Sequence, residues 1–484
     1  MDNKIVAHFY LTQSRGSLYL KIYKTSCIII AGSWTNSTGG NYLSNQIEKQ
    51  FMRFVIPSML TMLLQGLYII VDGFFVGQSI GDIGLAAINI AWPIASIIMA
   101  IGTGIGTGGA VVMSLAQGEN NKKASNLARG NTLMLLFISS IVLTIAFWFN
   151  YEKILSLLGA VGEVHFQAAR YTKYIVVGCA FQVFATGLTP LLRNSKKTIE
   201  AMIIMIVGLV ANIILDAIFI IILDKGIEGA AIATIIAQGI TTLLCIILFI
   251  KDKENRIKPK EFRLVRGAVK KILLTGLSPF GLFLSPSVII VFNNLQCLKY
   301  GGDVAVAAYS VISYVVGTGQ LLLSGVGEGI QPLISFCSGG NLFESMKIIK
   351  RKATIFVLIL SAILLSSMIF LRDIIPKVFG SSPVATEIMS SGLIITSLSL
   401  PCVALVKLAS SYFYAVGESK YSSIIIYGDP ILITPILILI LPRLFGLQGI
   451  WITLPLAQII MSIAILFMNN MHNSKIKKLK LSIH

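Results

Sequence analysis

The amino-acid sequence predicts an all-α polytopic membrane protein, with twelve transmembrane helices arranged in two pseudo-symmetric six-helix bundles. Three observations support this fold class. Of the 484 residues, 55% are hydrophobic and only 12% are charged, a composition too apolar for a soluble globular protein. The apolar residues gather in long stretches separated by short polar connections. Finally, the second half of the chain repeats the first.

Twelve apolar stretches are long enough to cross the hydrocarbon core of a bilayer, which requires about 20 residues of helix. Several exceed this minimum, which indicates tilted helices or helices that extend beyond the bilayer. In chain order, the predicted spans are residues 54–78, 84–115, 130–150, 166–191, 199–223, 229–250, 269–297, 304–337, 349–371, 384–415, 421–442 and 447–470.

Positive charges indicate the orientation of these spans. The formal net charge is +18, and most of the 39 Lys and Arg residues fall in segments on the same side of the membrane as the amino terminus. The most basic connection is the sixth, KDKENRIKPKEFRLVRGAVKK at residues 251–271. Because cytoplasmic connections are enriched in Lys and Arg, both termini are predicted to be cytoplasmic. Topology then explains the basic charge, and no nucleic-acid partner is expected.

An internal repeat relates the two halves of the chain. GDIGLAAINIAWPI from Gly81 aligns with GDVAVAAYSVISYV from Gly302, and GIEGAAIATIIAQ from Gly226 aligns with GLQGIWITLPLAQ from Gly446. The offset stays near about 220 residues, which indicates that six helices were duplicated. An even number of helices gives both copies the same orientation, and two such bundles can rock about a site between them.

The repeat and the charges divide the chain into five segments. The first has no role that its residues indicate, and the third connects the two bundles. The predicted segments are an amino-terminal extension (1–45), a first six-helix lobe (46–250), a basic cytoplasmic linker (251–271), a second six-helix lobe (272–470) and a basic cytoplasmic tail (471–484).

Several chemical motifs are missing from the sequence. There is no GxxxxGK[ST] phosphate loop, so ATP is not expected to drive the activity. The glycine-rich stretch GTGIGTGG at residues 102–109 lies inside an apolar span, where close helix packing explains it better than phosphate binding. The six Cys and four His residues form no metal or redox motif. Neither an enzyme activity nor a cofactor is therefore expected.

Five polar side chains are predicted to share one layer of the first bundle. Asp72 lies toward the outer end of the first span, where an ionisable group costs roughly 3 kcal/mol or more. Asn212 and Asp216 are four residues apart in the fifth span and share a face. Thr234 in the sixth span and Tyr171 in the fourth lie at a similar depth. Each residue alone would be explained by a helix–helix hydrogen bond, but their common depth favours a cation site.

The chemistry of this set suits either of two coupling ions. A metal ion such as Na+ needs carboxylate, amide and hydroxyl oxygens to replace its hydration shell, and Asp72, Asn212, Asp216 and Thr234 offer them. A proton needs only a buried carboxylate that can carry it. The sequence leaves the choice between Na+ and H+ open.

The second bundle carries different polar residues. Asn293 occupies the position that repeats Asp72, while Glu328, Lys407 and Asp429 lie nearer the inner side. Lys407 could neutralise either Glu328 or Asp429. A structural ion pair and a substrate contact in a cavity explain these residues equally well.

Three stretches resemble the multidrug and toxic compound extrusion (MATE) family, in its prokaryotic DNA-damage-inducible-like type. They are GLYIIVDGFFVGQSIG, RNSKKTIEAMIIMIVGLVANIILDAIF and GEGIQPLISFCSGGN, and the resemblance covers residues 46–470. It implies a cation site on Asp72, Asn212 and Asp216, with Thr234 and Tyr171 nearby. The ending FCSGGN departs from the NYGA-like ending of relatives, which bears on the substrate rather than on the fold.

The resemblance implies a secondary antiporter that exports organic, often cationic and amphiphilic, compounds in exchange for Na+ or H+. The alternative is a lipid-linked oligosaccharide flippase of the same superfamily. A flippase would need several central Arg or Lys residues for a pyrophosphate headgroup, and Lys407 is the only such candidate inside a span. The expected partners are a small organic substrate and the lipid bilayer, and the expected form is a monomer in a prokaryotic plasma (inner) membrane.

Overall fold

Every regular element in the part of the chain that the structure describes is a helix. The computed structural model describes residues 39–252, 259–378 and 383–483, so most of the predicted amino-terminal extension lies outside the described residues. Ten helices are long and apolar enough to cross a membrane, and two further pairs of bent helices raise the number to twelve if each pair is one span. The predicted fold class is confirmed.

The first lobe contains six crossing segments, of which the fourth is broken. Helices α7 and α8 meet at Gly178 and are bent by 59°. A Cβ atom at Gly178 would collide with the side chain of Ile235, so the absence of a side chain permits this bend against the sixth span. The elements are α3 (Gly39–Ile80), α4 (Asp82–Gly118), α5 (Lys122–Trp148), the short α6 (Tyr151–Leu157), α7 (Gly162–Val177), α8 (Cys179–Asn194), α9 (Thr198–Asp216), the π-helix η1 (Ala217–Ile222) and α10 (Gly226–Lys251).

The second lobe repeats this arrangement. Its fourth crossing segment is also broken, with a bend of 47°. The elements are a short connecting 3-10 helix η2 (Pro259–Phe262), α11 (Arg266–Gly339), α12 (Phe343–Leu371), the short α13 (Ile375–Val378), α14 (Pro383–Ser397), α15 (Leu400–Ala415), α16 (Ser419–Gly428), the π-helix η3 (Asp429–Ile433), α17 (Thr434–Phe445) and α18 (Leu447–Ile483).

Backbone conformations at the turns show the duplication directly. Gly81 has φ of 71° and its repeat partner Gly302 has φ of 64°, so Gly302 breaks the long helix α11 into two spans. Asn120 and its repeat partner Asn341 also have nearly equal positive φ angles, 57° and 56°. Left-handed conformations are uncommon outside glycine, asparagine and aspartate, so their recurrence at repeated positions indicates a common local structure.

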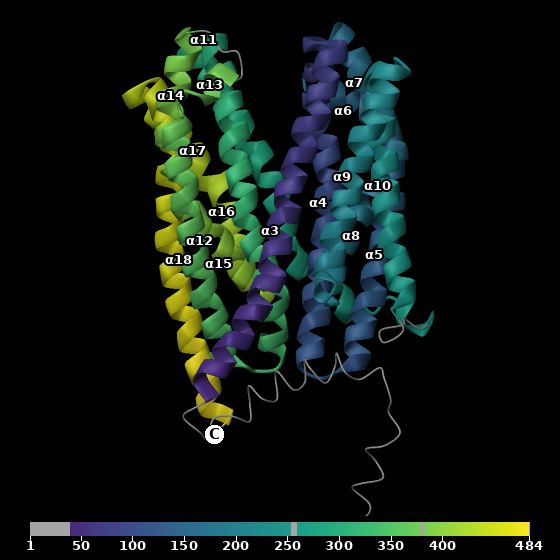
Figure 1. Cartoon of the computed structure of the whole chain (residues 1–484), viewed down its shortest axis with the longest axis vertical. Helices are drawn as coiled ribbons and strands as arrows, with labels where there is room; N and C mark the ends of the chain where they lie inside the picture. The colour runs from purple at the N-terminus through teal and green to yellow at the C-terminus, as the bar shows by residue number, and fades with distance from the viewer. Residues whose placement is uncertain (1–38, 253–258, 379–382, 484) are drawn as a thin grey trace, which may run out of the picture.

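The first helix of each lobe begins against the other lobe. Figure 1 shows α3 crossing diagonally from the base of the second lobe to the first. Its early residues Phe51 and Val55 belong to the hydrophobic core of the second lobe, whereas Val76 belongs to that of the first. Similarly, Ile272 near the start of α11 packs in the core of the first lobe. Two helices therefore tie the lobes together.

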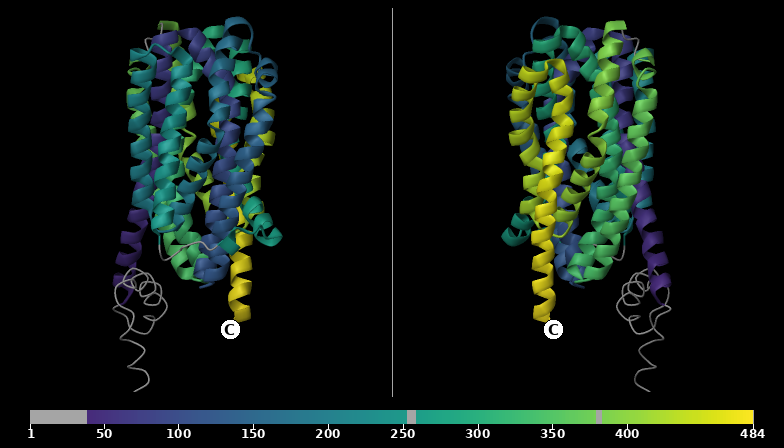
Figure 2. Two further views of the ribbon diagram at one scale, coloured as in Figure 1. Left: turned by 90° about the vertical axis from the view of Figure 1, so that its right-hand side faces the viewer. Right: turned by 90° about the vertical axis from the view of Figure 1, so that its left-hand side faces the viewer.

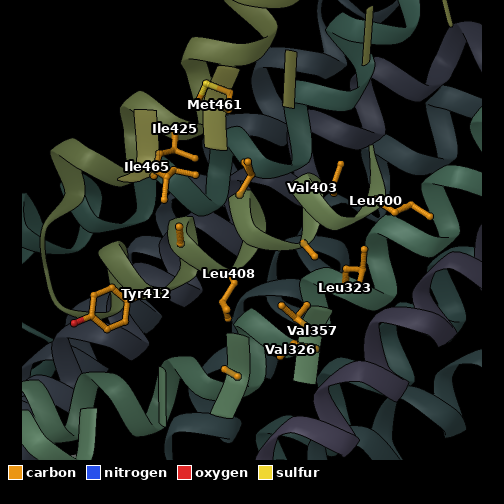
Figure 3. Packing of buried hydrophobic residues seen from close by; sticks show 14 of the residues in the cluster. Leu323, Val326, Val357, Leu400, Val403, Leu408, Tyr412, Ile425, Met461 and Ile465 are labelled. Carbon is orange, nitrogen blue, oxygen red and sulfur yellow. The ribbon is translucent and has the colours of Figure 1, made fainter. Parts of the chain in front are cut away.

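Part of the core of the second lobe is shown in Figure 3. Leu323 and Val326 of α11 lie near Val357 of α12, and residues of α15, α16 and α18 belong to the same cluster, together with residues of α3, α14 and α17. Many apolar side chains are nevertheless exposed on the outside of both lobes, as expected for a surface that contacts lipid.

The lobes lie closest at one end of the molecule, which we name the basic end. It carries the end of α18 and the end of α10, and the ribbons of the two lobes diverge toward the opposite end (Figure 1). Helix α18 projects beyond the bundle there (Figure 2).

Glycines permit the close approach of helices between and within the lobes. A Cβ atom at Gly276 of α11 would collide with the carbonyl oxygen of Gly104 in α4, so the two backbones touch across the lobe interface. Gly106 contacts Gly187 of α8 in the same way within the first lobe. The glycine-rich stretch in α4 thus serves helix packing, as predicted.

Candidate ion-binding site

The structure brings the polar residues predicted in the first lobe into one buried cluster. Asp72 of α3 interacts electrostatically with Asp216 of α9, and the Tyr171 hydroxyl of α7 interacts with both. Asn212 lies one turn before Asp216 on the same helix face, and both side chains are completely buried. Thr234 of α10 is buried as well, with 7% of its surface exposed. Four helices therefore contribute to the cluster.

Sequence reasoning missed one member of this cluster, Tyr68. Its hydroxyl interacts with Asp72 and Asp216 and lies toward Thr234 and Gln238. Tyr68 precedes Asp72 by four residues in α3, so the two side chains project from one helix face. The four-residue spacing of Tyr68 and Asp72 in the stretch YIIVD could have predicted this membership, because a polar group one helical turn from a buried carboxylate lies on the same face.

Most oxygen atoms of the cluster are buried without a hydrogen-bond partner among the described residues. Buried atoms without a partner include Tyr68 Oη, Asp72 Oδ1, both side-chain polar atoms of Asn212, both carboxylate oxygens of Asp216, and Thr234 Oγ1. Each such atom costs about 1–3 kcal/mol when buried. Proteins seldom leave so many unpaired polar atoms together, so the cluster has the donor set of a site for a bound ion or proton.

The donor chemistry fits a hard, small cation. Two carboxylates, an amide oxygen and hydroxyl oxygens match the preference of such cations for oxygen ligands. Two negative charges placed together in a dry interior repel each other strongly, so the site gains stability when a cation or protons reduce the negative charge.

A π-helical turn follows immediately after Asp216. Residues Ala217–Ile222 form η1, so the wider turn begins directly after the carboxylate. In the second lobe η3 likewise begins at Asp429. Single π-turns within α-helices often lie at functional sites, because they reorient side chains locally.

In the second lobe the buried carboxylates have partners. Asp429 accepts hydrogen bonds from Thr434 Oγ1 and Gln458 Nε2, both at 2.6 Å, and interacts electrostatically with Lys407. Asn293, at the repeat position of Asp72, donates its Nδ2 to the carbonyl oxygen of Ile289 at 2.8 Å.

Glu328 has a partner that the sequence did not suggest. The sequence suggested Glu328 or Asp429 as the partner of Lys407, and in the structure Lys407 interacts electrostatically with Asp429. Glu328 instead forms an ion pair of 2.5 Å with Arg193 of the first lobe. Among the described residues, the buried carboxylate oxygens without partners belong to Asp72 and Asp216.

The duplicated helical fold and a buried polar site inside one lobe define a multi-pass membrane transporter. Comparison with known families identifies it further: the family model MatE matches residues 57–218 and 280–438. The chain belongs to this family of MATE transporters and is not an enzyme, as the sequence predicted.

Relatives and solved structures agree with this assignment. The multidrug export protein MepA of Staphylococcus haemolyticus is 25% identical over 424 residues, covering 87% of this chain and 93% of the relative. MepA of Staphylococcus saprophyticus is 26% identical over 426 residues, with the same coverage of 87% and 93%. The outward-facing structure of a multidrug resistance MATE family transporter has a TM-score of 0.85 and 24% identity, covering 89% of this chain and 97% of that one. At this identity the structural match shows the fold alone.

Proposed function

We propose that the protein is a secondary antiporter that exports organic, cationic and amphiphilic compounds from the cytoplasm in exchange for Na+ or H+. The observation that carries this proposal is the cluster of unpartnered oxygen atoms around Asp72 and Asp216. The names of the MepA relatives, which are multidrug export proteins, support export of several compounds.

The coupling ion neutralises negative charge on Asp72 and Asp216 in the first lobe. Without an ion, Asp72 and Asp216 repel each other and attract a positively charged substrate. Binding of Na+ or H+ removes much of that negative charge, which weakens the attraction and changes the relative stability of the two lobe arrangements. Coupling requires only that ion and substrate stabilise different arrangements. Alternating access through relative movement of the lobes completes the cycle.

The basic end is the cytoplasmic end in this proposal, and both termini are assigned to the cytoplasm. The protein works as a monomer in a prokaryotic plasma membrane. The positive charge of the α10–α11 connection and the bacterial origin of the MepA relatives support this placement.

The flippase alternative has less support. An anionic pyrophosphate headgroup needs free positive charges, but Lys407 lies beside Asp429 and Arg193 is paired with Glu328. No relative named above is a flippase.

Export of a fluorescent cationic dye tests the proposal. Purified protein in proteoliposomes should transport dye when a gradient of its coupling ion, Na+ or H+, is imposed. Asp72→Asn should abolish the dye transport that depends on this gradient. Asp373→Asn is the matched control, because Asp373 is exposed in the α12–α13 connection. Normal gradient-driven transport by Asp72→Asn would reject the coupling role of the site.

A further inference from the structure

A buried polar network joins the two lobes at the basic end. Arg193, next to last in α8, donates from Nη2 to Glu328 Oε2 of α11 at 2.5 Å. The side chains are only 3% and 5% exposed. Tyr414 of α15 donates its hydroxyl to Glu328 Oε1 at 2.7 Å. Both oxygens of the carboxylate are therefore engaged, one by each lobe.

A second layer of the network lies beside the first. Asn194 Nδ2 donates to Gln331 Oε1 at 2.9 Å, and Gln331 Nε2 donates back to Asn194 Oδ1 at 3.1 Å. Ser114 of α4 adds a hydrogen bond of 2.6 Å to the same Asn194 oxygen. Gln331 follows Glu328 by three residues in α11, so these two side chains lie on one helix face, and they meet the last two residues of α8, Arg193 and Asn194.

The surrounding interface is closed to water. Val111 and Leu115 of α4 form a small buried cluster with Tyr414 of the second lobe. A Cβ atom at Gly118 would collide with the carbonyl oxygen of Phe336, so the backbones of α4 and α11 touch at this end. The ion pair therefore sits in a dry, tightly packed contact between the lobes.

We propose that Arg193 and Glu328, supported by Asn194 and Gln331, are positioning residues that hold the lobes together at the cytoplasmic end and must separate in every transport cycle. This inference rests on the proposed alternating access. A buried ion pair adds little net stability, because desolvation opposes its attraction, but removing one partner leaves an uncompensated charge. When the lobes part, water solvates both groups, so the pair favours closure without preventing opening.

Single neutralisation should therefore open the basic end. In Glu328→Gln the amide can still accept from Tyr414, but Arg193 loses its only anionic partner within the described residues, and its Nε and Nη1 already lack hydrogen-bond partners there. When the lobes separate, water can reach and hydrate the unpaired guanidinium of Arg193. The double variant Arg193→Gln with Glu328→Gln removes both charges and should close the interface again.

Labelling of a buried cysteine measures the opening without any transport assay. Leu115→Cys in a background without native cysteines is treated with a hydrophilic maleimide in nanodiscs, where both faces are accessible. We expect Glu328→Gln to raise the labelling rate about tenfold or more, because an unpaired buried charge is strongly destabilising. The double variant should return to within about threefold of the parent, since neutral hydrogen-bonded groups replace the charges.

Two further variants make the result decisive. Tyr414→Phe keeps the ring and the ion pair but removes one hydrogen bond, so it should fold and give a smaller increase of about threefold. The control is Arg170→Gln with Glu228→Gln, which removes a 2.9 Å ion pair within the first lobe and should leave labelling unchanged. Equal labelling of the parent, Glu328→Gln and Tyr414→Phe overturns the inference, as does a double variant as reactive as Glu328→Gln.

The labelling experiment also separates this inference from the proposed function. Increased labelling in a protein that exports no dye supports the contact between lobes and rejects the assigned substrate. Unchanged labelling in a protein that exports dye under an ion gradient rejects the role of the pair alone.

Discussion

The carboxylates of Asp72 and Asp216 interact across the interface between α3 and α9, and three of their four oxygen atoms are buried without a hydrogen-bond partner in the described part of the chain. Helices distant in sequence thus place two like charges together in an apolar surrounding. Such a contact is unfavourable unless a positive ion or a proton joins it.

Asp216→Asn should remove the stabilisation of the fold by the coupling ion. A ligand that binds only the folded state adds about 1.4 kcal/mol for each tenfold rise of its concentration above Kd. Thermal unfolding in detergent at several Na+ concentrations and pH values should show this dependence in the parent protein. In Asp216→Asn the melting temperature should respond to neither ion, whereas Asp373→Asn should behave like the parent. An unchanged ion response in Asp216→Asn would show that Asp216 does not bind the ion.

Tyr68→Phe should weaken ion binding without harming the fold. Its hydroxyl is buried and unpaired among the described residues, so its removal should leave stability unchanged or raise it by about 1 kcal/mol. The ion loses one oxygen ligand, so the concentration that gives half-maximal stabilisation should rise about tenfold. Ion-dependent melting curves check both effects. A loss of stability with unchanged ion dependence would instead show that the hydroxyl has a structural role.

Gly276→Val should prevent the lobes from packing together. A Cβ atom there would collide with the carbonyl oxygen of Gly104, and overpacking of this kind costs about 1–3 kcal/mol or more. We expect a lower melting temperature and reduced yield of monodisperse protein in size-exclusion chromatography. Gly267→Val is the matched control, because nothing lies within 4 Å of a Cβ atom at Gly267. Equal stability of the two variants would contradict the close backbone contact.

Asn131→Ala should release the connection between the lobes. Asn131 Oδ1 accepts the backbone N–H of Val265 at 2.8 Å, and its Nδ2 donates to the carbonyl oxygen of Arg263 at 3.1 Å. Loss of both bonds should cost about 1–3 kcal/mol and speed limited trypsin cleavage at the basic residues of this segment.

Asn126→Ala removes a single hydrogen bond of 3.2 Å to Glu261 and provides the comparison for Asn131→Ala. Its effect on cleavage should be smaller. Equal cleavage rates in the parent and Asn131→Ala would show that these bonds do not hold the segment.

Local sequence patterns predicted much of this molecule. Length and hydropathy predicted the twelve spans because a helix in lipid must satisfy its own backbone hydrogen bonds within each segment. The repeat predicted the two lobes, and the four-residue spacing of Asn212 and Asp216 predicted their shared face. The depth of Asp72, Thr234 and Tyr171, counted from the ends of their spans, predicted that they meet, although their role in ion binding stays a prediction.

Only the tertiary structure decided which helix faces meet. The sequence left Glu328 and Asp429 as possible partners for Lys407, but in the structure Glu328 of α11 forms an ion pair with Arg193 at the end of α8. Likewise, the bend at Gly178 and the start of α3 within the core of the second lobe depend on contacts between distant segments. The physical reason is that hydropathy and spacing set the depth and face of a residue, whereas its partner depends on the rotation and approach of neighbouring helices. Close packing at small residues such as Gly104 and Gly276 determines that approach, and no local pattern encodes it.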